Sequence, residues 1–326
     1  MAFFVQLREK IRHFVARREK RVLRLWYFLL SLAAMLTINE AFGYQDALNH
    51  WWVAVIIALI CSFLPPQGTT VILLFVILLH FMALSTNLAV TTLVLIFVCY
   101  GVCGYFRSES TYHLIAIPIL HQLQIPYAIP MGTALMRNIN EIAVVICGSF
   151  LSCFLKTVRD NASMFLDPTS QITALDLMQS QMLSRPLFYF FLAAMVAMFL
   201  VVYGIRNRNL EYAWLIAVLA GCLTEFVILL TGYLFTGNYS GVPSLIIGNV
   251  ITFLAGCVVN YIFLNLDYSR TEQVQFEDDE YYYYVTAVPK LHITEEEKEI
   301  KTITREPLDE KERRRRFRWN RKRSRK

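Results

Sequence analysis

Long apolar runs separated by short polar breaks fill most of the chain between residues 25 and 265. A helix needs roughly 17–25 apolar residues to cross the hydrocarbon core of a bilayer, and most of these runs reach that length. The pattern therefore predicts an all-α integral membrane protein with about eight transmembrane helices. They are expected at residues 25–42, 51–66, 69–86, 88–106, 138–156, 187–204, 210–235 and 244–265.

One further apolar segment, residues 111–136, has a different character. Pro118, Pro126 and Pro130 interrupt it, and it also contains two histidines and two glutamines. Proline removes a helical hydrogen bond, so an unbroken crossing helix is not expected here. The segment is predicted to be a pair of half-helices that re-enters the bilayer or lies at its interface.

The distribution of Lys and Arg supports this assignment. Of the 31 Lys and Arg residues, 11 lie at 311–326 and 8 at 1–24. Cytoplasmic segments carry an excess of these residues, so both termini are predicted to be cytoplasmic, whereas a ninth crossing at 111–136 would export the basic C-terminus. With eight crossings, the cations left on the outer side are Lys156, Arg159 and Arg185.

The predicted organisation has three parts. Residues 1–24 form a basic amphipathic cytoplasmic helix that either lies on anionic lipid of the inner leaflet or only orients the first crossing. Residues 25–266 form the transmembrane domain, whose longest external loop is 157–186. The cytoplasmic tail, 267–326, contains an acidic, tyrosine-rich and β-prone stretch at 272–290 and a polybasic end at 313–326.

Composition agrees with a membrane protein and disfavours several kinds of chemistry. The 326 residues are 56% hydrophobic and 17% charged, with a mean hydropathy of +0.45, whereas a soluble domain is about 25% charged. The seven cysteines form no CxxC pair and have no histidine at metal-ligand spacing. Phosphate-binding loops, zinc-hydrolase motifs and nucleophile elbows are absent. No metal or cofactor is predicted, and the sequence leans away from an enzyme.

Glu225, near the middle of the seventh predicted helix, is the sharpest candidate for a functional polar group. An ionised carboxylate is costly at that depth, so Glu225 is expected to face the bundle interior and to be protonated or partnered. It would relay protons or bind a cation, or only join helices by bonding Asn249, Asn260 or a backbone carbonyl. His80 would either complete a proton-relay pair with Glu225 or be a packing histidine.

A second candidate site surrounds the proline-broken segment. Arg137 and Glu141 lie one helical turn apart at the cytoplasmic mouth of the fifth predicted helix. Broken helices often line a substrate site, because their free backbone groups need polar company. The alternative is a snorkelling arginine that forms an ordinary ion pair with Glu141. The predicted lining of a re-entrant site is Pro118, Pro126, Pro130, Gly132 and Thr133.

The tail offers a site for a cytoplasmic protein partner. Residues 276–285 are β-prone after an acidic start, which predicts a strand that adds to a partner's sheet edge or pairs within a dimer. For the polybasic end, which carries Phe317 and Trp319, contact with anionic lipid is favoured over nucleic acid. The predicted docking residues are Phe276, Tyr281, Tyr282, Tyr283 and Tyr284.

Several of these segments resemble a known family. The run Val274-Gln-Phe-Glu-Asp-Asp-Glu-Tyr-Tyr-Tyr-Tyr-Val285, with Asn265-Leu-Asp-Tyr-Ser-Arg270 before it and Ala287-Val-Pro-Lys290 after it, resembles the end of an uncharacterised multi-pass membrane protein family of clostridial-type bacteria. Ile125-Pro-Tyr-Ala-Ile-Pro130, Gly132-Thr-Ala-Leu135 and Glu211-Tyr-Ala-Trp214 are similar to that family too. The polybasic end lies outside the resemblance. The resemblance implies a bacterial cytoplasmic membrane and no particular activity.

Three functional hypotheses follow from these features. The leading one is a non-enzymatic membrane anchor or docking protein whose partners are the lipid bilayer, anionic lipid at both basic termini and a cytoplasmic protein at 272–290. The second is a small-solute or ion transporter that uses Glu225 and the broken segment 111–136. The third is a lipid-modifying enzyme.

Overall fold

The structure, a computed structural model, describes residues 10, 14–15, 17–166, 173–208, 210–263, 272–278 and 280–287. The chain divides into two units between residues 264 and 265. Most of the basic helix predicted at 1–24 lies outside the described residues, and helix α2 (Glu19–Phe42) is the first that is described in full. The polybasic end at 313–326 lies outside them entirely.

Seven helices in the described part of the chain are long and apolar enough to cross a membrane. The chain is therefore built as an all-α membrane protein, as its apolar pattern predicts. In chain order these helices are α2, α4 (Pro66–Leu84), α5 (Thr86–Tyr105), α8 (Ile142–Asp160), α11 (Pro186–Arg206), α12 (Ala213–Thr236) and α13 (Val242–Phe263).

Short sequence signals set the ends of these helices. Pro66 and Pro186 occupy the first turns of α4 and α11, where the missing N–H removes no helical hydrogen bond. Ser85 has an extended backbone and separates α4 from α5. Gly237 ends α12 with a φ of +66°, a left-handed conformation that glycine adopts without steric cost.

Helix α3 (Trp51–Phe63) has 13 residues, fewer than the predicted run at 51–66. Such a helix rises about 20 Å, less than the ~30 Å thickness of a hydrocarbon core. It still reverses the chain direction against α2: it follows the C-terminal end of α2, and its last residue, Phe63, contacts Arg24 near the start of α2, with the guanidinium 5.5 Å from the ring centroid. Helix α3 therefore runs antiparallel to α2.

The proline-containing segment forms a helical hairpin, called the α6–α7 hairpin below. Helices α6 (His113–Gln122) and α7 (Ala128–Met136) are joined by a short turn at 123–127. Pro130 is tolerated because it lies in the first turn of α7. The Thr133 hydroxyl lies 3.3 Å from Nδ1 of His113, which places the end of α7 beside the start of α6. The hairpin therefore begins and ends at the same end of the bundle.

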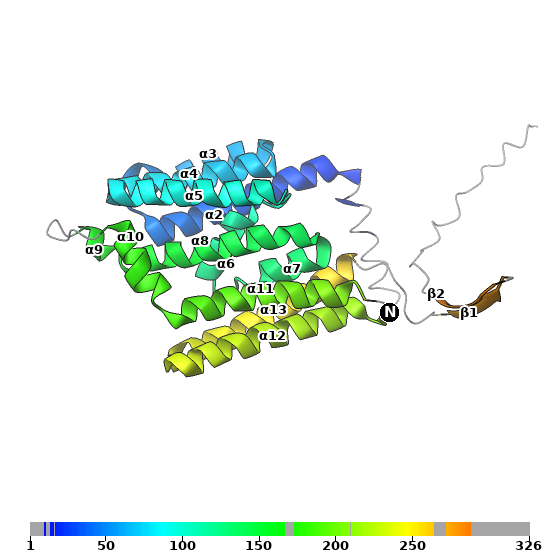
Figure 1. The fold of residues 1–326 in the computed structure, drawn as a ribbon. Coiled ribbons are helices and arrows are strands. Elements are labelled where there is room, and N and C mark those ends of the chain that lie inside the picture. Colours follow the sequence, from blue (N-terminus) through cyan, green and yellow to red (C-terminus); the bar gives the residue numbers. More distant parts are fainter. Residues whose placement is uncertain are drawn as a thin grey trace, which may run out of the picture. The chain divides into compact units, whose positions relative to one another are not determined.

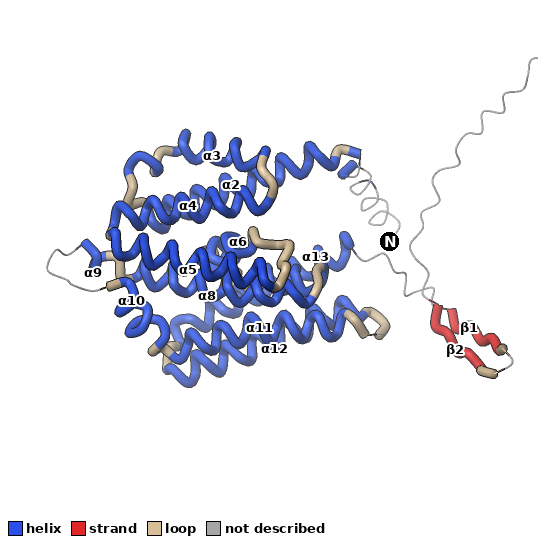
Figure 2. Tube along the Cα trace, turned by 45° about the horizontal axis from the view of Figure 1, so that its top comes forward, coloured by secondary structure: helices blue, strands red, loops and turns tan. Residues whose placement is uncertain are grey.

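Figures 1 and 2 show α6, α7 and α8 between two groups of helices, α2 to α5 on one side and α11 to α13 on the other. Helix α6 packs against α2, α4 and α8, whereas α7 packs against α11, α12 and α13. The buried apolar residues accordingly form two main clusters, one for each group, and α6 contributes Ile115 to the first and Ile117 to the second. The hairpin thus joins the two halves of the bundle.

The second unit contains two antiparallel strands, β1 (Glu272–Glu277) and β2 (Tyr282–Ala287). This differs from the single extended strand predicted over 276–285, because the chain reverses after Glu277. The Asp278 carboxylate accepts hydrogen bonds from the backbone N–H groups of Glu280 (3.0 Å) and Tyr281 (2.7 Å) and from the Tyr283 hydroxyl (2.8 Å). These bonds hold the turn and lower the pKa of Asp278 from its ordinary value.

Candidate functional site

The base of the α6–α7 hairpin is closed by two residues of the second predicted site. Glu141 is buried, and its carboxylate accepts hydrogen bonds from the backbone N–H groups of Glu109 (2.8 Å) and Ser110 (3.3 Å). Arg137 donates to the Glu109 carboxylate (3.0 Å) in an exposed ion pair. The ordinary ion pair between Arg137 and Glu141 is therefore not formed. Both residues instead tie the chain after α7 to the loop that precedes α6.

The five predicted lining residues are distributed along the hairpin. Pro118 is buried inside α6, and Pro130 and Thr133 are buried on α7. Gly132 is half-buried on α7, and the Thr133 hydroxyl donates to the Ile129 carbonyl (2.6 Å). Pro126, in the turn, lines a cavity at the tip of the hairpin.

The hairpin tip packs closely against α13 on one side and is bonded to α8 on the other. A Cβ atom at Gly248 of α13 would lie 2.4 Å from the carbonyl oxygen of Gln124. Gln124 has a φ of +64°, which lets the chain turn, and its side-chain Oε1 accepts from the Ser244 hydroxyl (2.8 Å). Gln122 accepts a hydrogen bond from Arg159 of α8. These contacts hold the tip between the two helices.

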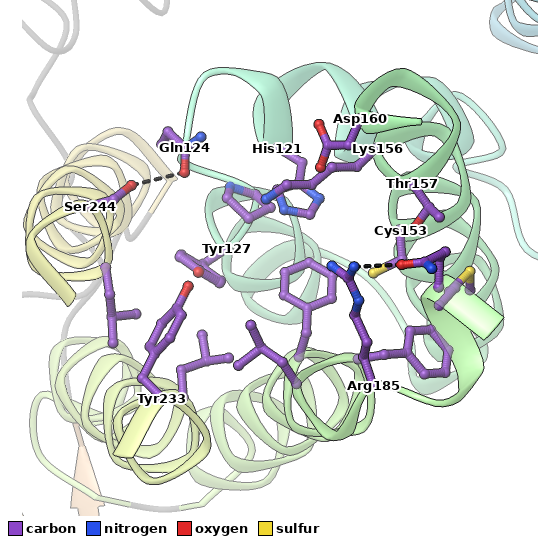
Figure 3. A pocket seen from close by; sticks show the side chains of 18 residues that line it. His121, Gln124, Tyr127, Cys153, Lys156, Thr157, Asp160, Arg185, Tyr233 and Ser244 are labelled. Carbon is purple, nitrogen blue, oxygen red and sulfur yellow. Dashed lines mark hydrogen bonds between the residues drawn. The ribbon is translucent and has the colours of Figure 1, made fainter. Parts of the chain in front are cut away.

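A cavity of about 150 Å³ lies beside the tip (Figure 3). Its wall is formed by the hairpin tip and by parts of four long helices: the end of α8, the start of α11, the second half of α12 and the start of α13. These parts meet because successive long helices reverse direction. The exposed residues Lys156, Asp160 and Arg185 mark its mouth. Its other polar lining residues include His121, Gln124, Tyr127, Thr157, Tyr233 and Ser244.

Aromatic side chains that line the cavity contact one another and are held in place. Phe191 of α11 stacks on the imidazole of His121, with ring centroids 4.8 Å apart. The edge of the His121 ring is held as well, because Nδ1 lies 2.5 Å from the Ser152 hydroxyl of α8. Tyr127 and Tyr233 lie together on the opposite side, and Figure 3 shows their hydroxyl groups pointing toward one another.

Glu225 lies one helical turn from Leu229 and two turns from Tyr233, both of which line the cavity, so the three side chains share a face of α12. Glu225 is fully buried. Asn249 donates one hydrogen bond to Oε2 of Glu225 and another to the carbonyl oxygen of Cys222 (2.9 Å). Oε1 of Glu225 has no hydrogen-bond partner among the residues that the structure describes. The bond to Asn249 joins α12 to α13, as the helix-joining alternative predicts, and it leaves one carboxyl oxygen unused.

His80 and Glu225 do not form the relay pair considered from the sequence. The backbone N–H of Gln45 donates to Nδ1 of His80 (3.2 Å), which leaves Nε2 to donate to Asn39 (3.2 Å). Helix α4, which carries His80, lies on the opposite side of the bundle from α12 (Figures 1 and 2). His80 is thus a packing histidine with both ring nitrogens satisfied. Asn260 is not bonded to Glu225 either, and its buried Oδ1 has no partner in the described part of the chain.

The cavity also collects residues that the sequence reasoning did not assign to a site. Two of the three cations placed on the outer side by the eight-crossing topology, Lys156 and Arg185, line it, and the third, Arg159, bonds to the hairpin tip. Lys and Arg are generally in excess in cytoplasmic segments, so these three cations on the predicted outer side are unusual. Their position was the sequence signal for this site. The cavity tyrosines carry no such signal, since aromatic residues are common near membrane interfaces.

Within the described residues, no group of three or more His, Cys, Asp and Glu side chains is placed to hold a metal ion. All seven cysteines are free thiols. No protein-family model, curated protein or solved structure matches this chain. Its function is therefore inferred from the geometry of the site.

Proposed function

We propose that this protein is a membrane transporter for a small solute, and that the cavity at the tip of the α6–α7 hairpin is its binding site. The observation that carries the proposal is a helical hairpin in the bundle interior, with a cavity at its tip and a buried carboxyl, that of Glu225, one helical turn from the cavity lining. Transporters often build substrate sites from broken helices, because the helix ends leave polar backbone groups for the solute. A membrane anchor needs none of these features.

In the proposed topology, α3 crosses the membrane in addition to the seven long helices, which gives eight crossings. The α6–α7 hairpin re-enters from the cytoplasmic side. The antiparallel course of α3 against α2 supports a crossing, and local thinning of the bilayer accommodates a short helix at modest cost. Both termini then lie in the cytoplasm of a bacterial cell, and the cavity mouth with Lys156, Asp160 and Arg185 opens to the outside.

Glu225 is proposed to couple proton movement to solute movement. A protonated carboxyl is neutral and donates a hydrogen bond, whereas the carboxylate is charged and only accepts one. Glu225 is one turn from the cavity lining, so its protonation state and the occupancy of the cavity influence each other. Such a linkage is reciprocal by thermodynamic necessity: protonation of Glu225 changes the affinity for the solute by the same factor as the solute changes the affinity for the proton. A transporter whose cavity opens alternately to the two sides uses this change to couple solute movement to a proton gradient.

We expect reconstituted wild-type protein to carry a solute from a broad panel, with a flux that increases under an imposed proton gradient. Glu225→Gln keeps the side-chain shape but cannot titrate, so the flux should no longer increase under the imposed proton gradient. Glu40→Gln, which removes an exposed carboxyl on α2, is the matched control and should leave the flux unchanged. Equal, background-level flux in wild type and Glu225→Gln across the whole panel would contradict transport.

A second candidate function is the docking of a cytoplasmic protein on the tail hairpin, and the exposed apolar face of the two strands favours it. In the observed register Val274 is opposite Val285 and Phe276 is opposite Tyr283, whose rings stack with centroids 5.0 Å apart. These four side chains are 37–51% exposed. Tyr281, Tyr282 and Tyr284 are more exposed still. A two-stranded hairpin is only marginally stable by itself, so a partner that covers this face would stabilise it.

A tag at the C-terminus is expected to react with a membrane-impermeant reagent only after cells are permeabilised, because docking requires a cytoplasmic tail. Deletion of 272–290 should then remove a specific set of proteins that cross-link to the tail, while solute flux stays unchanged. A tag that reacts in intact cells would overturn the topology, and an unchanged cross-linked set would overturn the docking function.

A further inference from the structure

The cations on the proposed outer side are not spread over that face. The outer segments at 43–50, 85 and 237–241 contain no Lys or Arg, whereas Lys156 and Arg185 both line the cavity and Arg159 bonds to Gln122 at the end of α6. Lys156 reaches it from the end of α8, and Arg185 from the residue just before α11. Helix packing thus brings two of the three predicted outer cations to the cavity.

These cations are available to a ligand. Arg185 donates to the Gln181 side chain (2.6 Å), which orients its guanidinium, and this is one of the five N–H groups that an arginine can donate. Within the described residues, neither Lys156 nor Arg185 forms an ion pair. Asp160 is the one acidic side chain in the lining, and it lies one turn beyond Lys156 toward the end of α8. The lining therefore carries two cationic side chains and one acidic side chain.

The rest of the cavity suits an apolar body. Phe188 and Phe191 of α11 and Leu229 of α12 form its apolar surface, and the tyrosine hydroxyls lie on the side away from Arg185 (Figure 3). The volume of about 150 Å³ is close to that of an engineered apolar protein cavity that binds benzene, also about 150 Å³. A ligand of this size has one ring or one branched chain.

We infer that the cavity binds a small carboxylate with an aromatic or branched apolar body, about the size of benzoate. The carboxylate lies between Lys156 and Arg185, since a guanidinium matches its two oxygens geometrically and both bonds are charge-assisted. The body lies against Phe188, Phe191 and Leu229. This inference names the substrate class of the proposed transporter and therefore rests on the proposed function.

The test compares three ring compounds that differ mainly in charge: benzoate, benzamide and benzylamine, with acetate as the probe that lacks the ring. Binding is measured by calorimetry on the full-length protein in lipid nanodiscs. Benzoate should bind at least about tenfold more tightly than each of the other three, because each lacks either the charge or the apolar body. Equal or tighter binding of benzylamine or benzamide, or no binding of benzoate, would overturn the inference.

Substitutions then locate the site. Lys156→Met with Arg185→Gln should weaken benzoate binding about tenfold or more and leave benzamide binding nearly unchanged. Arg208→Gln removes an exposed cation that does not line the cavity, and should change neither. Thermal unfolding of each variant checks that it is folded, and Lys156→Met alone serves if the double variant is not. Unchanged benzoate affinity in a folded variant would place the ligand elsewhere.

The same preparation separates this inference from the proposed function. Glu225-dependent flux of a different solute, with no benzoate binding, would overturn the substrate class and leave transport standing. Benzoate binding that depends on Lys156 and Arg185, with no flux of any solute, would overturn transport and leave a carboxylate-binding site. Absence of both binding and flux would overturn the two together.

Discussion

Replacement of Gly248 with alanine is expected to destabilise the protein by about 1–3 kcal/mol, the usual cost of overpacking a well-packed interior. The added Cβ would lie 2.4 Å from the Gln124 carbonyl oxygen, which is a backbone atom at the tip of the hairpin. A backbone atom cannot move aside as a side chain does, so the tip must leave its position against α13. Because the tip forms part of the cavity wall, ligand binding should fall as well.

The measurement is thermal unfolding in detergent, followed with a thiol-reactive dye, since five of the seven free cysteines are buried in the folded protein. Gly132→Ala is the matched control. Gly132 lies on the same hairpin, but a Cβ there would meet no heavy atom within 4 Å. Alanine also has the higher helix propensity, so this change should be neutral or slightly stabilising. A Gly248→Ala protein that unfolds and binds like wild type would show that the tip is not packed against α13.

Removal of the Glu141 carboxylate should be the most damaging single change at the base of the hairpin. Glu141→Ala removes the acceptor of the buried Ser110 N–H and of the part-buried Glu109 N–H. Hydrogen bonds to a charged group contribute about 1.5–3 kcal/mol each, so a loss of several kcal/mol is expected. The variant should unfold at a clearly lower temperature or fail to accumulate in the membrane.

The exposed ion pair beside Glu141 supplies the control. Glu109→Gln breaks the contact with Arg137, whose side chain is 45% exposed, and solvent-exposed ion pairs contribute only about 0–1 kcal/mol. The expected order of stability is wild type, then Glu109→Gln close behind, then Glu141→Ala far below. If the two variants lose equal stability, the Glu141 carboxylate does not hold the hairpin base. Glu141→Gln, which keeps one acceptor oxygen, should recover part of the loss.

These two positions show why the hairpin governs both the fold and the proposed site. Gly248 fixes its tip and Glu141 fixes its base, and between them α6 and α7 join the two halves of the bundle. The cavity exists only while the tip stays against α13. Stability and ligand binding are therefore expected to change together in variants of the tip, whereas variants of Lys156 and Arg185 should alter binding alone.

The local sequence determined the membrane class, most of the helices and the break at residues 111–136. Apolar runs of crossing length indicate helices because a helix satisfies all its own backbone groups in lipid, whatever its neighbours are. The prolines predict the break for an equally local reason. Glu225 was identified because any carboxylate at that depth needs an explanation. The short α3 shows the limit of this reasoning, since an apolar run does not reveal where its helix stops.

Only the tertiary structure decided which polar groups meet. It bonds Glu225 to Asn249 and gives His80 the partners Asn39 and Gln45, although the sequence allowed a His80–Glu225 pair. It also pairs Arg137 with Glu109 rather than with Glu141.

The cavity depends on tertiary structure most of all, because its lining comes from segments between residues 121 and 245 that meet only after the helices pack. Periodicity along a chain reports which face of one helix is apolar. The polar contacts across several helices are set by packing, which no single segment of sequence encodes.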